Sequence, residues 1–420
     1  MFPLLVGIAI MAPASPAPPV SLAELFEEAR RKNPDIRAAR ARGRATAAAV
    51  APAGAFEDPM LMVQFWNMPV DLSVVPLMVS LTQPIPLGGK RAARRDEAQA
   101  MAEASRDGVT TVVRDVEAQI AKAYFDLFLA DRTMAVDDEI GRTLRSLVAA
   151  ASSRLAAGRG EESEVLRAES EELKVRSDRE AASARRSAAV AKLVALLDRP
   201  PGSDMGPTGE PALLPSLPPQ EALRERALRE RPELGVSSAA AAAAEARLRA
   251  ARAEKTPDVA VSAGEMHVFR GVARPADFLF LGVQGNLPIF GSKNGAHVET
   301  AQAGLASMRE ETHALENRVM AEIADAFAEV QAEQRQTELH HQLVPLSHQA
   351  LASALASYSA GRGGFPMVLD AERDLQMHQL DLAMHMAAYS QHLADLERAV
   401  GGDIGLVRAA TSGTHMSHEE

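Results

Sequence analysis

The 420-residue sequence contains no cysteine. This absence excludes disulfide bonds, thiolate metal sites and a catalytic thiol, and it predicts that no lipid is attached through an N-terminal cysteine. Aromatic residues are also scarce, with 12 Phe, 3 Tyr and 1 Trp, although 47% of the residues are apolar. Because large aromatic side chains supply much of the area of a thick core, this composition predicts long and thin contacts between elements.

The sequence also has no excess of basic residues. The chain has 56 Asp and Glu against 45 Lys and Arg, which gives a net charge of −11. Proteins that bind nucleic acid usually present a basic face, so we expect no nucleic-acid partner. The sequence also lacks a P-loop, a His-Glu-x-x-His motif and a Gly-x-Ser-x-Gly motif. These absences predict a protein that is not an enzyme and that uses no cofactor.

Long apolar runs are limited to the N-terminus. Phe2–Ala12 is apolar and is followed by Ala12-Pro13-Ala14. The run is well short of the ~20 residues that a membrane-spanning helix needs, and its small-residue ending is typical of a cleaved leader. We predict a signal peptide over residues 1–14, with a disordered apolar tail as the alternative. Elsewhere no stretch is apolar enough for a spanning helix, so any membrane insertion would use strands.

The rest of the chain consists of two similar repeats. Asn33-Pro34-Asp35-Ile36 recurs as Arg231-Pro232-Glu233-Leu234 at an offset of 198 residues, and Ala157–Gly160 recurs as Ala360–Gly363 at an offset of 203. Matches that keep their order in this way indicate a tandem duplication. We predict a first repeat over residues 15–199, a Pro/Gly-rich linker over 200–219, a second repeat over 220–403 and a flexible tail over 404–420.

Each repeat contains two segments in which apolar residues alternate. Leu77, Val79 and Leu81 alternate with Met78, Ser80 and Thr82, which predicts a strand with one apolar and one small or polar face. The predicted strands cover residues 58–67, 76–85, 257–269 and 277–288, and each has about the ~9–11 residues of a tilted membrane strand. Since the smallest membrane barrels have eight strands, either these are soluble hairpins or several chains pool their strands.

Long helices follow each pair of strands. They are expected over Lys90–Ala157 and Lys293–Ala360, with return helices over residues 161–198 and 366–400. A helix of this length reaches ~100 Å. Apolar residues step by four and three along the first of them, which is the period of a coiled-coil seam: Val109, Val113, Val116 and Ile120. The predicted fold is mainly helical and repeats a unit of helix, β-hairpin and long helix pair.

Taken in order, these segments resemble the TolC family of outer-membrane efflux channels over essentially the whole chain. The motifs that carry the resemblance are Asn33-Pro34-Asp35, Leu81–Arg91, Arg231–Leu234, Asn286–Gly291, Tyr358–Gly361 and Val368–Ala371. The resemblance implies a homotrimer in which four strands per chain form a twelve-stranded β-barrel in outer-membrane lipid. It also implies that the helices continue the barrel as an α-helical tunnel through the periplasm.

The first hairpin resembles one branch of that family. Asp58-Pro59-Met60-Leu61 and the Pro-Leu-Gly-Gly-Lys-Arg ending at residues 86–91 are similar to the branch paired with heavy-metal pumps of the resistance-nodulation-division class. The resemblance implies a passive exit duct for heavy-metal cations, served by an inner-membrane pump and a periplasmic adaptor. Two alternatives stay open: the same fold serving organic compounds or protein secretion, and a soluble periplasmic coiled-coil scaffold or adaptor.

The resemblance also assigns roles to residues near the helix turns. It implies that Gly158, Arg159, Gly361 and Arg362 form the tips that meet the adaptor, although glycines that reverse a helix explain these turns equally well.

The same resemblance implies that Tyr358, Asp370, Ser163 and Glu164 close the pore and select cations. A solvated carboxylate near a helix N-terminus is the alternative for Asp370. Met367 stands where the family pattern has a second aspartate.

Three histidines of the last long helix follow a spacing of seven residues: His378, His385 and His392. Imidazole suits copper or zinc, but residues seven apart lie ~10 Å apart along a helix, too far to share one metal within a chain. Polar residues beside the coiled-coil seam are therefore the preferred interpretation. His415, Met416 and His418 at the end of the chain are an equally weak metal-binding pattern.

Overall fold

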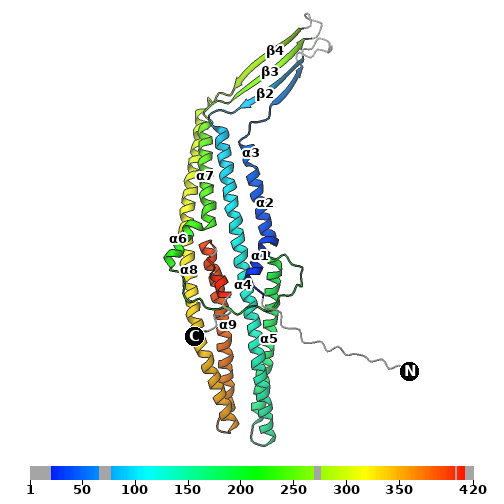
Figure 1. Cartoon of the computed structure of the whole chain (residues 1–420), viewed down its shortest axis with the longest axis vertical. Helices are drawn as coiled ribbons and strands as arrows, with labels where there is room; N and C mark the ends of the chain where they lie inside the picture. Colours follow the sequence, from blue (N-terminus) through cyan, green and yellow to red (C-terminus); the bar gives the residue numbers. More distant parts are fainter. Residues whose placement is uncertain (1–19, 66–76, 269–275, 403, 412–420) are drawn as a thin grey trace, which may run out of the picture.

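The computed structural model of this protein describes residues 20–65, 77–268, 276–402 and 404–411. The molecule is elongated, with a small sheet at one end and the turns of two long helical hairpins at the other (Figure 1). None of the described helices combines the length and the apolarity that are needed to cross a membrane. The predicted signal peptide, residues 1–14, lies outside the described residues.

The elements of the two repeats follow the same order, except that among the described residues α3 of the first repeat has no counterpart in the second. The first consists of α1 (Leu22–Lys32), α2 (Pro34–Ala48), α3 (Val50–Ala53), β1 (Met60–Phe65), β2 (Leu77–Ile85), α4 (Lys90–Ala156) and α5 (Glu162–Leu196). The second consists of α6 (Gln220–Glu230), α7 (Pro232–Ala253), β3 (Val259–Val268), β4 (Ala276–Gly285), α8 (Gly291–Ser359) and α9 (Phe365–Val400), and α10 (Leu406–Thr411) follows it.

The repeated Asn-Pro-Asp and Arg-Pro-Glu motifs are the starts of α2 and α7. The Asn33 side chain accepts hydrogen bonds from the N–H groups of Asp35 and Ile36 at 2.9 and 3.1 Å, which satisfies two free donors of the first turn. A proline fits the first helical position because no N–H is needed there. In α7 Arg231 replaces the asparagine, and this buried guanidinium pairs with Glu322 of α8 at 2.6 Å.

The four strands form one antiparallel sheet in the order β1-β2-β3-β4. β2 pairs with β3 from Leu77 opposite His267 to Ile85 opposite Val259, so the central pair of strands joins the two repeats. β1 and β4 are the edge strands. Because β2 leads directly into α4 and β4 leads into α8, both long helices leave from the same end of the sheet (Figure 1).

The main core lies at the level where α1, α4, α5, α6, α8, α9 and α10 meet, which we call the waist. Its largest fully buried side chains include Tyr124, Tyr389, Phe125, Ile120, Leu127 and Leu193. A second cluster lies closer to the turns and includes Ile140, Leu144, Leu351, Phe365 and Leu375. The predicted seam is present: Val116 and Ile120 are buried, and Val113 packs against them. Most of the few aromatic side chains of the core thus gather at the waist.

The linker between the repeats crosses the waist without forming a helix. Its backbone N–H groups at Gly209 and Leu214 donate to the hydroxyls of Tyr124 and Tyr389 at 2.8 and 3.1 Å. These bonds give the two buried phenols the partners that such groups require. The linker is therefore fixed to both α4 and α9.

Residues 406–411 differ from the flexible tail predicted over residues 404–420. They form α10, in which Leu406, Val407 and Ala410 are buried. The Glu397 side chain accepts a hydrogen bond from the N–H of Leu406 at 2.5 Å, and the Ala410 carbonyl accepts one from the linker at Ala212, at 2.8 Å. Apolar side chains that cover the waist core order this segment. Residues 412–420, with His415, Met416 and His418, lie outside the described residues.

A buried lysine ties the helices to the sheet. Lys90 opens α4, and its ammonium group contacts the Asp258 carboxylate at 2.7 Å and the Thr256 carbonyl at 2.9 Å. Both partners directly precede β3, so this contact joins the first repeat to the second. The equivalent lysine of the second repeat, Lys293, is exposed on α8.

We expect Lys90→Met to lower the free energy of unfolding by about 1–3 kcal/mol, because the charged Asp258 and the Thr256 carbonyl lose their partner. Lys293→Met is the matched control and should change it by less than about 0.5 kcal/mol. Urea unfolding in detergent, followed by circular dichroism, measures both. Equal effects of the two substitutions would contradict the role of Lys90.

Candidate functional site

One face of the sheet is apolar and exposed. Directly opposed residues of antiparallel strands point to the same side, and the register places Leu61, Leu81, Ala263 and Leu281 in one row across all four strands. Leu61 and Leu281 are 68% and 77% exposed, and Leu279 in the adjacent row is 86% exposed. A contiguous apolar surface of this kind marks contact with a membrane or with another protein.

The opposite face of the sheet is mixed, because small and polar side chains share it with large apolar ones: Met60, Met62, Met78, Met266, Phe278 and Phe280. Thr82, Ser262 and Gly282 form one row on it, in register with the apolar row beside it. Polar residues also occur on the apolar face: Gln83 lies toward the helices, Glu265 lies in the row of Leu279, and His267 lies 2.5 Å from Asp277 at the far end. The two faces therefore differ most clearly between the row of Leu81 and the neighbouring row of Thr82.

The two hairpin turns at the other end of the molecule have the same backbone geometry. Gly158 and Gly361 have φ angles of 66° and 73°, in the left-handed region that favours glycine. The N–H of the following residue, Arg159 or Arg362, bonds to the carbonyl five positions earlier, at 2.9 Å in both turns. These are Schellman caps, which end α4 and α8. Both arginine side chains are exposed.

Tyr358 and Glu164 join the two hairpins just above these turns. The Tyr358 hydroxyl, at the end of α8, donates a hydrogen bond to the Glu164 carboxylate near the start of α5, at 3.0 Å. The Tyr358 side chain is buried, and its ring packs edge-on against Phe365 with ring centroids 5.8 Å apart. Burial raises the pKa of Tyr358, and the bond to Glu164 adds to the shift, so the phenol keeps its proton.

Arg154 completes this contact and was not found by sequence reasoning. Its guanidinium donates to the Tyr358 carbonyl at 3.0 Å and lies 4.5 Å from the centroid of the Tyr358 ring. It also donates to the Arg159 carbonyl of its own turn at 3.3 Å. The one sequence signal that pointed to Arg154 is its place in the last turn of a helix, where a basic side chain complements the helix dipole.

Ser163 and Asp370 lie apart from the Tyr358 contact. The Ser163 hydroxyl donates to the Glu161 carboxylate at 3.0 Å. The Asp370 carboxylate is exposed and lies 4.0 Å from the Arg373 guanidinium, one turn further along α9. The structure thus brings together two of the four residues that the sequence assigned to the gate and leaves the other two on the surface.

A buried carboxylate lies next to Asp370 on α9. Glu372 is 1% exposed, and among the described residues neither of its carboxylate oxygens has a hydrogen-bond partner. Burial raises its pKa to about 7, the nearby Glu171 carboxylate of α5 contributes in the same direction, and Arg373 and Lys174 oppose the shift. Arg373 instead binds Glu171 at 2.7 and 3.1 Å and lowers the pKa of that carboxyl.

The candidate histidines of α9 separate into two groups. The rings of His378 and His385 lie on either side of His340 of α8, with centroid distances of 5.7 and 5.1 Å. His392 is separate from them, and its Nδ1 lies 2.9 Å from the Glu329 carboxylate. His340 does not share the spacing of seven, and only the packing of α8 against α9 reveals its position.

We expect Glu372→Gln to stabilise the protein in alkaline but not in acidic solution. The folded pKa of about 7 lies above the ordinary 4.5, so the cost of ionising Glu372 is absent below about pH 4 and complete above about pH 8. The gain in the free energy of unfolding should be about 1–3 kcal/mol at about pH 8 and near zero at about pH 4.

Urea unfolding at the two pH values measures this gain. Glu169→Gln, at an exposed carboxylate of α5, is the control and should show no such difference. A gain from Glu372→Gln that is equal at both pH values would contradict the prediction.

Comparisons with known proteins agree with this geometry. Residues 25–199 and 223–402 match the family described as outer membrane efflux protein. The cobalt-zinc-cadmium resistance protein CzcC of Cupriavidus metallidurans is 26% identical over 322 residues, which cover 76% of this chain and 75% of that relative.

Two solved structures share the fold. The outer membrane protein VceC of Vibrio cholerae superposes with a TM-score of 0.77 at 21% identity, over 91% of this chain and 96% of that one. CusC, solved in a study of transmembrane channel formation, has a TM-score of 0.79 at 20% identity, over 91% and 92% of the two chains.

The family match covers both repeats and most of the chain. It confirms the resemblance to outer-membrane efflux channels, the mainly helical fold with a membrane sheet, the outer-membrane location and the absence of an enzymatic role. The chain belongs to the outer membrane efflux protein family.

Proposed function

We propose that three copies of this chain form an exit duct that conducts heavy-metal cations passively from an inner-membrane pump and its periplasmic adaptor to the exterior. The observation that carries this proposal is the sheet, with its exposed apolar face and its two open edges. The duct itself supplies no energy, and its chemistry is limited to passage and gating.

The edges of the sheet are the reason for an oligomer. In hydrocarbon every backbone N–H and C=O group must be paired, so β1 and β4 cannot both remain open. Pairing of β1 in one copy with β4 in the next closes the sheet into a ring. Three copies, as the family resemblance implies, give twelve strands, with the row from Leu61 to Leu281 facing lipid and the row from Thr82 to Gly282 facing the lumen.

The hairpin turns suit a docking role for the adaptor. Arg159 and Arg362 are exposed at the end of the molecule farthest from the sheet. Exposed apolar side chains lie within seven residues of them along the chain, namely Leu155, Leu166 and Met367. A surface that combines arginine with apolar side chains is typical of protein interfaces. This end of the duct would therefore meet the adaptor.

The contact between Tyr358 and Glu164 suits a gate. It links the end of α8 to the start of α5, so separation of the two hairpins must break it. A hydrogen bond to a charged group contributes about 1.5–3 kcal/mol, which holds a closed state and still allows opening. Arg154 holds the same tyrosine from α4. Beside them, three exposed Asp370 carboxylates in the trimer would attract cations.

Two observations favour metal cations as the cargo. The relative CzcC is named for resistance to cobalt, zinc and cadmium, and this chain carries a net charge of −11. An acidic duct favours the entry of cations over anions.

We expect a deletion strain to lose tolerance to cobalt, zinc or cadmium and to regain it with the wild-type gene. Growth in graded metal concentrations measures this, with the protein followed as a heat-resistant trimer in the outer-membrane fraction. Unchanged metal tolerance together with new sensitivity to organic compounds would contradict metal cations as the cargo but would still support the exit duct. A soluble monomer would overturn the duct altogether.

We expect Tyr358→Phe to favour the open state, because the phenylalanine cannot donate to Glu164. Loss of about 1.4 kcal/mol per chain corresponds to a roughly tenfold shift in the ratio of open to closed states. Single-channel conductance in planar bilayers measures this ratio. Tyr389→Phe is the control, since Tyr389 binds the linker at the waist, and its conductance should match the wild type. Identical conductance of the two variants would count against the gate.

A further inference from the structure

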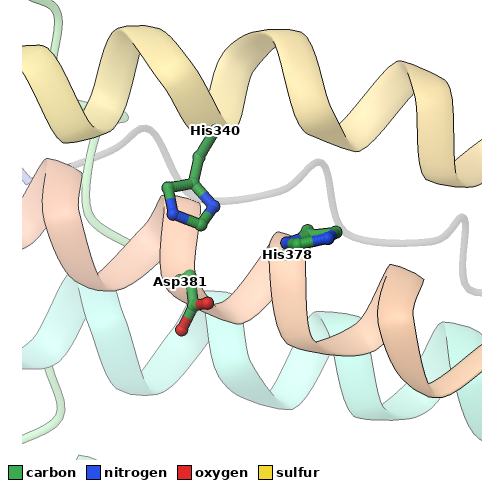
Figure 2. A group of neighbouring side chains, drawn as sticks. All are labelled: His340, His378 and Asp381. Carbon is green, nitrogen blue, oxygen red and sulfur yellow. The ribbon is translucent and has the colours of Figure 1, made fainter.

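Two histidines and an aspartate converge between α8 and α9. Figure 2 shows His340 on α8 facing His378 and Asp381 on α9. One ligand atom from each of the three side chains lies within 4.8 Å of the other two. Imidazole nitrogen and carboxylate oxygen are the donors that zinc and related divalent cations take in proteins.

The spacing on α9 places the donors on one face of that helix. His378, Asp381 and His385 are separated by three and four residues, which are the intervals of side chains that lie above one another. His340 lies between the two histidines of α9, so the distance that prevents them from sharing a metal along one helix is bridged from the other helix. The site thus uses residues of both α8 and α9.

Two of the ring nitrogens are available for coordination. The Nδ1 atoms of His340 and His378 are buried, and among the described residues neither has a hydrogen-bond partner. Buried polar atoms normally have such a partner, so these two require an explanation. A neutral imidazole is the form that binds metal.

The fourth side chain, His385, is already oriented. Its Nδ1 lies 2.7 Å from the Glu333 carboxylate of α8. A carboxylate in this position fixes the ring of a metal ligand and leaves Nε2 as its coordinating nitrogen. The same arrangement recurs at many zinc sites, where the carboxylate also makes the imidazole a better ligand.

We propose that His340, His378 and Asp381 bind one divalent cation of the zinc class in each chain, with His385 in the fourth position and Glu333 orienting it. Donors that surround a tetrahedral zinc ion lie roughly 3–3.5 Å apart, so small side-chain rotations close the observed spacing. Met377 and Met384, the thioether donors of α9, are exposed. The donor set therefore favours zinc, cobalt or nickel over monovalent copper or silver.

A cation held in this way links α8 to α9 between the waist and the turns. The link is a property of the folded chain and does not depend on which cargo passes through the duct. The metal site and the proposed function are tested separately. Direct metal binding tests the site, and growth in graded metal concentrations tests the function.

The experiment titrates the purified, chelator-stripped full-length protein with Zn²⁺ in a calorimeter. We expect one Zn²⁺ per chain. His340→Gln, His378→Gln and Asp381→Asn should each weaken binding by at least about tenfold. The matched control is His341→Gln, at the exposed neighbour of His340 on α8, and its affinity should equal that of the wild type. The visible absorption of Co²⁺ bound in place of zinc should be intense and should be lost in the same three variants.

A further variant distinguishes loss of the metal site from loss of the fold. Glu333→Gln removes the charge that orients His385 but keeps the shape of the side chain, and it should weaken Zn²⁺ binding by about tenfold while trimer formation and helical content stay unchanged. The proposal is overturned if the wild type binds no Zn²⁺. It is equally overturned if folded ligand variants bind Zn²⁺ as tightly as His341→Gln does.

Discussion

The structure depends on the pairing of β2 with β3, because this pairing carries backbone hydrogen bonds from one repeat to the other. Within hydrocarbon no water can replace such a bond. The pairing leaves one free edge on each repeat and fixes the register that places the apolar row of Leu81 and the polar row of Thr82 on opposite faces. It also sends α4 and α8 away from the same end of the sheet (Figure 1), so that two helical hairpins of nearly the same length run side by side.

The two ends of the helical part are held by different kinds of contact. At the waist Tyr124, Phe125 and Tyr389 fill a tight apolar core, and the linker satisfies both phenols. Toward the turns, buried polar groups are mixed into the packing. Asp137 of α4 accepts a hydrogen bond from Gln376 of α9 at 3.1 Å, and burial raises its pKa above the ordinary value. Such contacts contribute less net stability than apolar burial, so local opening is expected first near the turns.

Much of the fold could be predicted from the sequence because its signals are local or periodic. The alternation of Leu77, Val79 and Leu81 predicted a strand with two different faces, and the repeated Pro-containing motifs are helix starts in the structure. The features that were missed depend on how one helix is rotated against another. His340 and Arg154 look like ordinary surface residues until α8 and α9, or α4 and α8, are packed together. The helix over residues 406–411 is short, and only the waist core explains its order.

The attachment of α10 has a practical consequence for handling the protein. Because its last described residue, Thr411, lies against the waist and is joined through Ala410 to the linker, chain that continues beyond it starts at mid-height on the molecule. A reporter or affinity domain joined there would leave both the membrane strands and the hairpin turns unobstructed. The waist therefore offers a place to immobilise or label the protein without contact to the sheet or to the hairpin turns.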